Sequence, residues 1–297
     1  MDIGLISTGL LIGVLVGLIG MSGGALLIPM LVLFFQVSPL TAVSSGLLVA
    51  LVMKPLGAAV HMQQRTVHWG IVRWLAVGSM PAALVGAMVI GVVGHTPGME
   101  NALKLFIGIT LCLSVGMTLL RQVLDRRQSE HPRRQPEVRP LPTMMIGAIG
   151  GFAVGMTSVG AGSLIVASLL VVYPELQAAQ LIGTDIVQAV PLVAAATVAH
   201  LHYGDVHLAL TSSLLLGALP GVYLGARFST RSIGVLIRPT ITIVLLVSAL
   251  VMLQAPPLLL ICAPIVALII LILLRMPPQP APAPAQADAA AASAEVP

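Results

Sequence analysis

The sequence predicts an all-α, multi-pass membrane protein with two homologous halves, arranged as inverted repeats with a broken or re-entrant first helix in each half. Three observations support this fold class. Of 297 residues, 58% are hydrophobic and only 8% charged, with a mean hydropathy of +1.05, whereas soluble domains carry about 25% charged residues. The apolar residues form nine stretches, most of them near the ~20 residues that cross a bilayer as a helix. Finally, a long part of the first half recurs in the second.

The nine apolar stretches are predicted to be helices, because no alternation of apolar and polar residues typical of membrane strands recurs. In chain order they are 3–35, 40–62, 70–94, 102–120, 143–173, 177–201, 207–228, 235–254 and 257–274. We therefore expect five regions: a membrane repeat (1–120), a basic linker (121–142), a second membrane repeat (143–254), an extra transmembrane helix (255–275) and a disordered Pro/Ala-rich tail (276–297).

The internal repeat can be seen in the residues themselves. Residues 61–87 align without a gap onto residues 200–226, and residues 17–27 align onto residues 155–165. A membrane chain made of two related halves usually functions at the interface between them, and transporters are the main users of this plan.

The first stretch of each half, 3–35 and 143–173, is too long for one crossing and is interrupted by glycines. These are Gly17, Gly20, Gly23 and Gly24 in one half, and Gly147, Gly150, Gly151, Gly155, Gly160 and Gly162 in the other. If both stretches are re-entrant hairpins, each half has three crossings and the halves are inverted. If both are long kinked spans, the halves are parallel. Only the inverted arrangement places every arginine, with the linker and the tail, in the cytoplasm, so the positive-inside tendency favours it.

Several motifs then resemble one known family. They are GLIGMSGGALLIP (17–29), SSGLL (44–48), its counterpart GTDIV (183–187) and two His-x6-His stretches (61–68 and 200–207). In this order, repeated twice, they resemble the TauE/SafE family of sulfite exporters. The resemblance covers residues 10–255 and implies an inner-membrane permease for small anions such as sulfite, sulfonates or related organosulfur acids. The family's GGG run is replaced here by Ser-Gly-Gly and Gly-Ala-Gly.

Glycine-rich breaks flanked by hydroxyl groups suit an anion, because a helix that restarts presents free N–H groups and the positive end of its dipole. The alternative is that the glycines only allow close helix packing. The candidate substrate-binding residues are Ser22, Gly23, Gly24, Ser45, Gly46, Lys54, Thr157, Ser158, Gly160, Gly162, Ser163, Gly183 and Thr184.

Two charged residues lie within apolar stretches. Lys54 is predicted either to attract the anion or to extend to the membrane surface. Asp185 is predicted to load and release a coupling proton, or else to make a structural hydrogen bond or neutralise Lys54. The repeat-related histidines, His61 with His200 and His68 with His207, show no zinc-binding spacing. Interface packing is the favoured interpretation, with a role in coupling as the alternative. The two cysteines, Cys112 and Cys262, are interpreted as small core residues.

These features favour a secondary anion transporter with small anions and protons as partners and without a cofactor, a metal or nucleic acid. The sequence contains no Walker A motif, so an ion or substrate gradient must supply the energy. An intramembrane enzyme is disfavoured because no GxSxG or HExxH motif is present. A membrane scaffold or accessory subunit of another complex is the alternative function.

Overall fold

The computed structural model describes residues 3–19, 24–94, 96, 98–127, 137–159, 161–227 and 231–273, and every regular element in these ranges is helical. The elements are α1 (Ile3–Ile19), α2 (Gly24–Phe34), α3 (Pro39–Gln63), α4 (Trp69–Gly94), α5 (Glu100–Arg127), α6 (Pro140–Thr157), the π-helical turn η2 (Ala161–Ile165), α7 (Val166–Val172), α8 (Ala178–Tyr203), α9 (Leu208–Arg227), α10 (Arg231–Met252) and α11 (Pro257–Leu273). Helix α5 continues into the predicted linker, because Arg and Gln residues sustain a helix beyond the apolar stretch.

The helices have the length and surface of a membrane protein. Within the described ranges, six are long and apolar enough to span a bilayer: α3, α4, α5, α6, α8 and α9. Their outer surfaces carry large apolar side chains, such as Ile149 and Val92, which are 68% and 65% exposed. Such surfaces face lipid. The predicted all-α, multi-pass membrane fold is confirmed.

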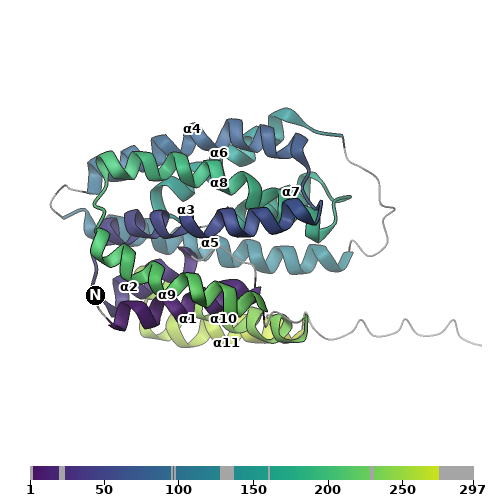
Figure 1. Cartoon of the computed structure of the whole chain (residues 1–297). Helices are drawn as coiled ribbons and strands as arrows, with labels where there is room; N and C mark the ends of the chain where they lie inside the picture. Colours follow the sequence, from purple (N-terminus) through teal and green to yellow (C-terminus); the bar gives the residue numbers. More distant parts are fainter. Residues whose placement is uncertain are drawn as a thin grey trace, which may run out of the picture.

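The two halves interlock. The sequence repeat pairs α1 with α6, α3 with α8, and α4 with α9. In space, however, α1 packs along α9, and α6 packs along α4. Figure 1 shows α4, α6 and α8 on one side of the bundle, α1 and α9 on the other, and α3 between them. The first helix of each half therefore packs against the fourth helix of the opposite half.

Stripes of glycine allow the first helix of each half to pack on the opposite half. A Cβ atom added at Gly147, Gly151 or Gly155 of α6 would collide with a backbone carbonyl oxygen of α4. Glycines at 217, 221 and 225 of α9 approach α1 in the same way. In lipid, such stripes allow helix backbones to pack at close range. The expectation that Gly147, Gly150, Gly151 and Gly155 interrupt a helix is therefore wrong, since all four lie within continuous α6.

The segment from α6 to α7 is a hairpin. Tyr173, at the end of α7, accepts a hydrogen bond from the Arg139 backbone N–H at 2.8 Å and forms a second hydrogen bond with the Thr143 hydroxyl at 2.5 Å. Both partners lie at the start of α6, so the chain returns to the end of the bundle from which it entered. Tyr173 and Thr143 are buried, which fixes the two ends of the hairpin together.

Helices α3 and α8 run antiparallel through the centre. At one end, Ser44 near the start of α3 contacts His200 near the end of α8. At the other end, Thr184 near the start of α8 accepts a hydrogen bond from the backbone N–H of His68, just beyond the end of α3. Repeat-related helices thus cross the interface in opposite directions.

Candidate functional site

The break after α6 is held by local hydrogen bonds. Ser158 has a left-handed backbone conformation, with φ at 55°, and its N–H donates to the Val154 carbonyl at 2.6 Å. The Thr157 hydroxyl accepts from the Val159 N–H at 3.2 Å and donates to the Ala153 carbonyl at 2.7 Å. Helix α6 therefore ends abruptly at membrane depth, where backbone must be enclosed by protein or line a wet cavity.

The two halves meet at this break. Helix α2 starts at Gly24, and a Cβ atom at Gly24 would collide with the Ser158 carbonyl oxygen and lie 3.1 Å from the Ser158 hydroxyl. The Ser158 side chain is 5% exposed, and its hydroxyl has no hydrogen-bond partner within the described chain. The start of α2 presents N–H groups and the positive end of its dipole. A helix N-terminus of one half thus lies against an unpartnered hydroxyl of the other.

Further buried hydroxyl groups lie on the two central helices, α3 and α8. Ser45 of α3 and Thr197 of α8 are fully buried, and neither hydroxyl has a hydrogen-bond partner within the described chain. Gly46, next to Ser45, packs on Ile28 of α2 at 3.5 Å from a built Cβ atom. Buried polar groups are normally satisfied, so unpartnered hydroxyls at an interface between halves mark a candidate ligand site.

One imidazole connects three helices beside the break. His200 of α8 is 0% exposed. Its Nε2 lies 2.9 Å from the Gly155 carbonyl oxygen in the last turn of α6, and its Nδ1 lies 2.8 Å from the Ser44 hydroxyl of α3. The side chain joins the end of α6 to the opposite half, in agreement with a role at the interface.

A second polar group lies toward the start of α8. Asp185 is 3% exposed, and Lys54 of α3 is half-buried and close enough for its charge to interact with that of Asp185. One turn further along α8, the amide oxygen of Gln188 accepts a hydrogen bond from the Ser79 hydroxyl of α4 at 3.0 Å. The two charged residues that the sequence singled out therefore lie near each other across the interface between halves.

Other candidate residues have local partners. The Ser163 hydroxyl donates to Ser114 of α5 at 2.8 Å, and Thr184 accepts from the His68 backbone. Gly183 packs on the Thr66 side chain, and Gly162 lies in η2. Ser22, Gly23 and Gly160 lie outside the described residues, as do the predicted tail and residues 128–136 of the predicted linker.

Sequence reasoning missed four buried polar residues: Ser44, Ser79, Gln188 and Thr197. The available signal was their placement within apolar stretches, where an uncompensated polar group is costly. That signal does not reveal the partner, which comes from another helix in both hydrogen bonds shown here.

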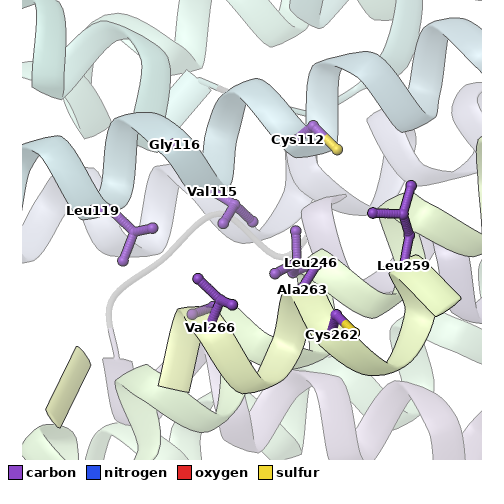
Figure 2. Close-up of a pocket in the computed structure, with 10 residues that line it drawn as sticks. Cys112, Val115, Gly116, Leu119, Leu246, Leu259, Cys262, Ala263 and Val266 are labelled. Carbon is purple, nitrogen blue, oxygen red and sulfur yellow. The ribbon is translucent and has the colours of Figure 1, made fainter. Parts of the chain in front are cut away.

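The described residues also form an apolar groove away from these polar groups. It has a volume of about 420 Å³ and lies between α5, α10 and α11. Figure 2 shows Cys112, Val115 and Leu119 along one wall, on α5, and Cys262 and Val266 on the facing wall, on α11. Cys262 is exposed, so its interpretation as a core residue is wrong. The lining offers no donor for an anion and suits lipid chains.

Within the described chain, no group of three His, Cys, Asp or Glu side chains is placed to hold a metal ion. What the fold does present is a set of membrane-spanning helices in two interlocked halves, with broken helices meeting at buried polar groups. This arrangement defines a membrane transporter.

Comparison with known proteins agrees with this class. The chain matches the family model described as "Sulfite exporter TauE/SafE" over residues 5–252. It is also 36% identical over 240 residues to the "Probable membrane transporter protein YjnA" of Bacillus subtilis (strain 168). The aligned region covers 78% of this chain and 91% of that protein. No solved structure is significantly similar to this chain. The chain belongs to the TauE/SafE family, whose members are membrane transporters and not enzymes.

Proposed function

We propose that this protein is a secondary transporter that moves small anions, such as sulfite, sulfonates or other organosulfur acids, across the inner membrane. The observation that carries the proposal is the contact between Gly24, at the start of α2, and the buried hydroxyl of Ser158, which has no hydrogen-bond partner among the described residues. Backbone N–H groups and hydroxyl groups donate hydrogen bonds to oxyanions, and the dipole of α2 favours negative charge.

The proposed binding site combines the candidate residues of both halves. Gly24 and Ser158 form its centre, with Ser45 and Gly46 supplied by α3. Ser22, Gly23, Gly160 and Gly162 belong to the same two breaks by sequence. Lys54 contributes positive charge from the middle of α3, because a cation within a membrane span is retained for a partner or an ion path.

We propose further that the halves are inverted. The antiparallel crossing of α3 and α8 supports this, because these helices are repeat equivalents. The α6–α7 hairpin supports a three-crossing half, since its two ends meet at Tyr173. Gly70, at the start of α4, packs on Val138, which lies just before α6, so the Arg65 loop and the linker share one end of the bundle. This end is proposed to be cytoplasmic.

Proton coupling through Asp185 completes the proposed mechanism. The carboxyl group is buried within the membrane span and is within electrostatic range of Lys54. A proton taken up by Asp185 changes the field at Lys54 and therefore the attraction that Lys54 exerts on an anion. Proton binding and anion binding are then linked through one pair of side chains.

The test is anion flux in proteoliposomes that contain the purified protein, with sulfite, methanesulfonate and thiosulfate as substrates. Ser158→Ala should weaken the apparent affinity by about 10- to 100-fold, because a hydrogen bond to a charged group contributes about 1.5–3 kcal/mol. The matched control is Ser212→Ala, which removes an exposed hydroxyl of α9 and should leave the affinity unchanged. Absence of flux of every anion through folded wild-type protein would refute the proposal and favour a scaffold or accessory subunit.

A further inference from the structure

We propose that His200 is a proton-loading residue of the carrier and exchanges protons with the solvent through Ser44 and Asp205. The inference rests on the proposed transport function and adds a second proton site to Asp185. The two residues lie 15 positions apart on α8, or about 22 Å along the helix. They would therefore serve opposite ends of the bundle.

The partners of His200 place a hydrogen on Nε2. The Gly155 carbonyl can only accept a hydrogen bond, so Nε2 carries a hydrogen and donates to it at 2.9 Å. The backbone N–H of Asp205 can only donate, and it points to the Ser44 oxygen at 3.2 Å. The Ser44 hydroxyl then donates to Nδ1 at 2.8 Å. These contacts fit a neutral imidazole that has its hydrogen on Nε2 and its basic nitrogen facing Ser44.

Protonation is compatible with the same contacts. A proton bound by the Asp205 carboxyl passes by way of the Thr41 hydroxyl to Ser44, and Ser44 gives its own hydroxyl proton to Nδ1, so both hydroxyls stay neutral and Asp205 becomes a carboxylate again. Thr41 and Ser44 are three positions apart on α3 and therefore share one face of the helix. The resulting imidazolium donates from Nδ1 to Ser44 and from Nε2 to the Gly155 carbonyl. The serine oxygen has two lone pairs, so it can accept from Nδ1 and from the Asp205 N–H together. Neither helix has to move for the proton to be taken up.

The chain of polar groups continues to solvent. The Thr41 hydroxyl donates to the Asp205 carboxylate, which is 42% exposed and lies 3.8 Å from the imidazole of His207, itself 65% exposed. The backbone at Gly204 packs on both Ser44 and His200, with a built Cβ atom 2.6 Å from the serine oxygen. The buried imidazole therefore lies close to an exposed acid, because its partner Ser44 bonds to the Asp205 backbone and Thr41 bonds to the Asp205 carboxylate.

The surroundings of His200 contain few other titratable groups. Helix α3 contributes hydroxyls at this end, α6 contributes the Gly155 carbonyl, and the neighbouring end of α4 has no charged side chain among the described residues. Beyond Asp205 and His207, the titratable groups are His202 and Tyr203, whose rings contact each other on the exposed end of α8. Imidazole titrates within the pH range over which a membrane pH gradient acts.

Among the described residues, the Ser44–Asp205 contact has no repeat-related counterpart at the other end of the bundle. The repeat equivalent of Ser44 is Gly183, and that of Asp205 is Thr66. His61, the equivalent of His200, is half-buried and bonds to Thr66 in its own hairpin at 2.9 Å. Proton exchange is therefore assigned to the Asp205 end. Because Gly155 precedes Ser158 by one turn, an imidazolium would place positive charge beside the proposed anion site.

The experiment separates proton coupling from anion binding. Wild-type protein and the variants His200→Gln, Ser44→Ala, Asp185→Asn and His202→Gln are reconstituted, and each is assayed for methanesulfonate and sulfite counterflow at equal pH and for flux driven by a pH gradient. His202→Gln is the matched control, because His202 is exposed on the same helix. We expect His200→Gln to retain counterflow and to lose stimulation by the gradient, Ser44→Ala to reduce that stimulation, and the control to resemble wild type.

Full gradient stimulation in folded His200→Gln would overturn the inference, as would an equal loss of both activities, which would indicate a structural role. Loss of stimulation in Asp185→Asn alone would assign coupling to Asp185 and also overturn it. Failure of counterflow in the wild-type protein is a different result, since it refutes the transport function on which the inference rests.

Discussion

Gly24→Ala tests whether the contact between the two breaks is a binding site or only a packing contact. The substitution adds a single methyl group at the start of α2, where its Cβ atom would collide with the Ser158 carbonyl oxygen. The neighbouring atoms are backbone, which cannot rotate away as a side chain can. The start of α2 and the α6 break must therefore separate by about 1 Å to restore ordinary contact.

The magnitude of the effect can be worked out from this geometry. Overpacking costs about 1–3 kcal/mol, while alanine in place of glycine in a helix returns up to about 1 kcal/mol. The net loss of stability is therefore about 0–2 kcal/mol. The effect on anion binding is larger, because displacing donors by this distance weakens a charge-assisted hydrogen bond that contributes about 1.5–3 kcal/mol. The apparent affinity should fall by about 10- to 100-fold.

The assay is concentration-dependent sulfite or methanesulfonate counterflow in proteoliposomes, with thermal unfolding of the same preparation. Gly116→Ala is the control, because a Cβ atom at Gly116 of α5 has no neighbouring atom within 4 Å. That variant should be at least as stable as the wild-type protein and bind with equal affinity. Unchanged affinity in folded Gly24→Ala would refute the binding role and reduce this glycine to a helix contact.

Four further predictions address the rest of the molecule. Asp185→Asn should abolish stimulation of flux by a pH gradient, and full stimulation in the folded variant would remove Asp185 from the mechanism. The double variant in which Lys54 and Asp185 exchange places should show more flux than either single variant, Lys54→Asp or Asp185→Lys. Tyr173→Phe should destabilise the protein by about 1–3 kcal/mol in thermal unfolding, because it removes the hydrogen bonds of Tyr173 with the Arg139 backbone and the Thr143 hydroxyl. An unchanged melting temperature would contradict the role of Tyr173 in holding the two ends of the hairpin together. A reporter fused after residue 205 should be active on the extracytoplasmic side, whereas cytoplasmic activity would support parallel halves.

Part of this architecture was predictable because lipid leaves few choices. A chain with so little charge must satisfy its backbone within helices, so apolar stretches of ~20 residues predict the spans almost directly. The repeat predicted which helices are equivalent, and it placed Ser158 and Gly24 at the ends of their respective breaks. The contact between these two residues did not follow from the sequence, since it depends on how the halves are docked.

The glycines show most clearly what the sequence left open. A glycine in a membrane helix is compatible with a break, a turn or a close helix contact, and local sequence does not distinguish these outcomes. Gly151 lies within a continuous helix because the backbone of α4 packs against it. The chain turns at Ser158, after which the Val159 N–H donates to the Thr157 hydroxyl and not to a carbonyl one turn earlier.

The sequence by itself determined that the chain is helical, lies in the membrane and contains two related halves, because hydropathy and self-similarity are properties of the chain alone. Only the tertiary structure decided that the first helix of each half packs on the opposite half, and that His200 bonds to Ser44 and Gly155. The physical reason is that a buried polar group needs a partner, and the partner is chosen by the packing of helices distant in sequence.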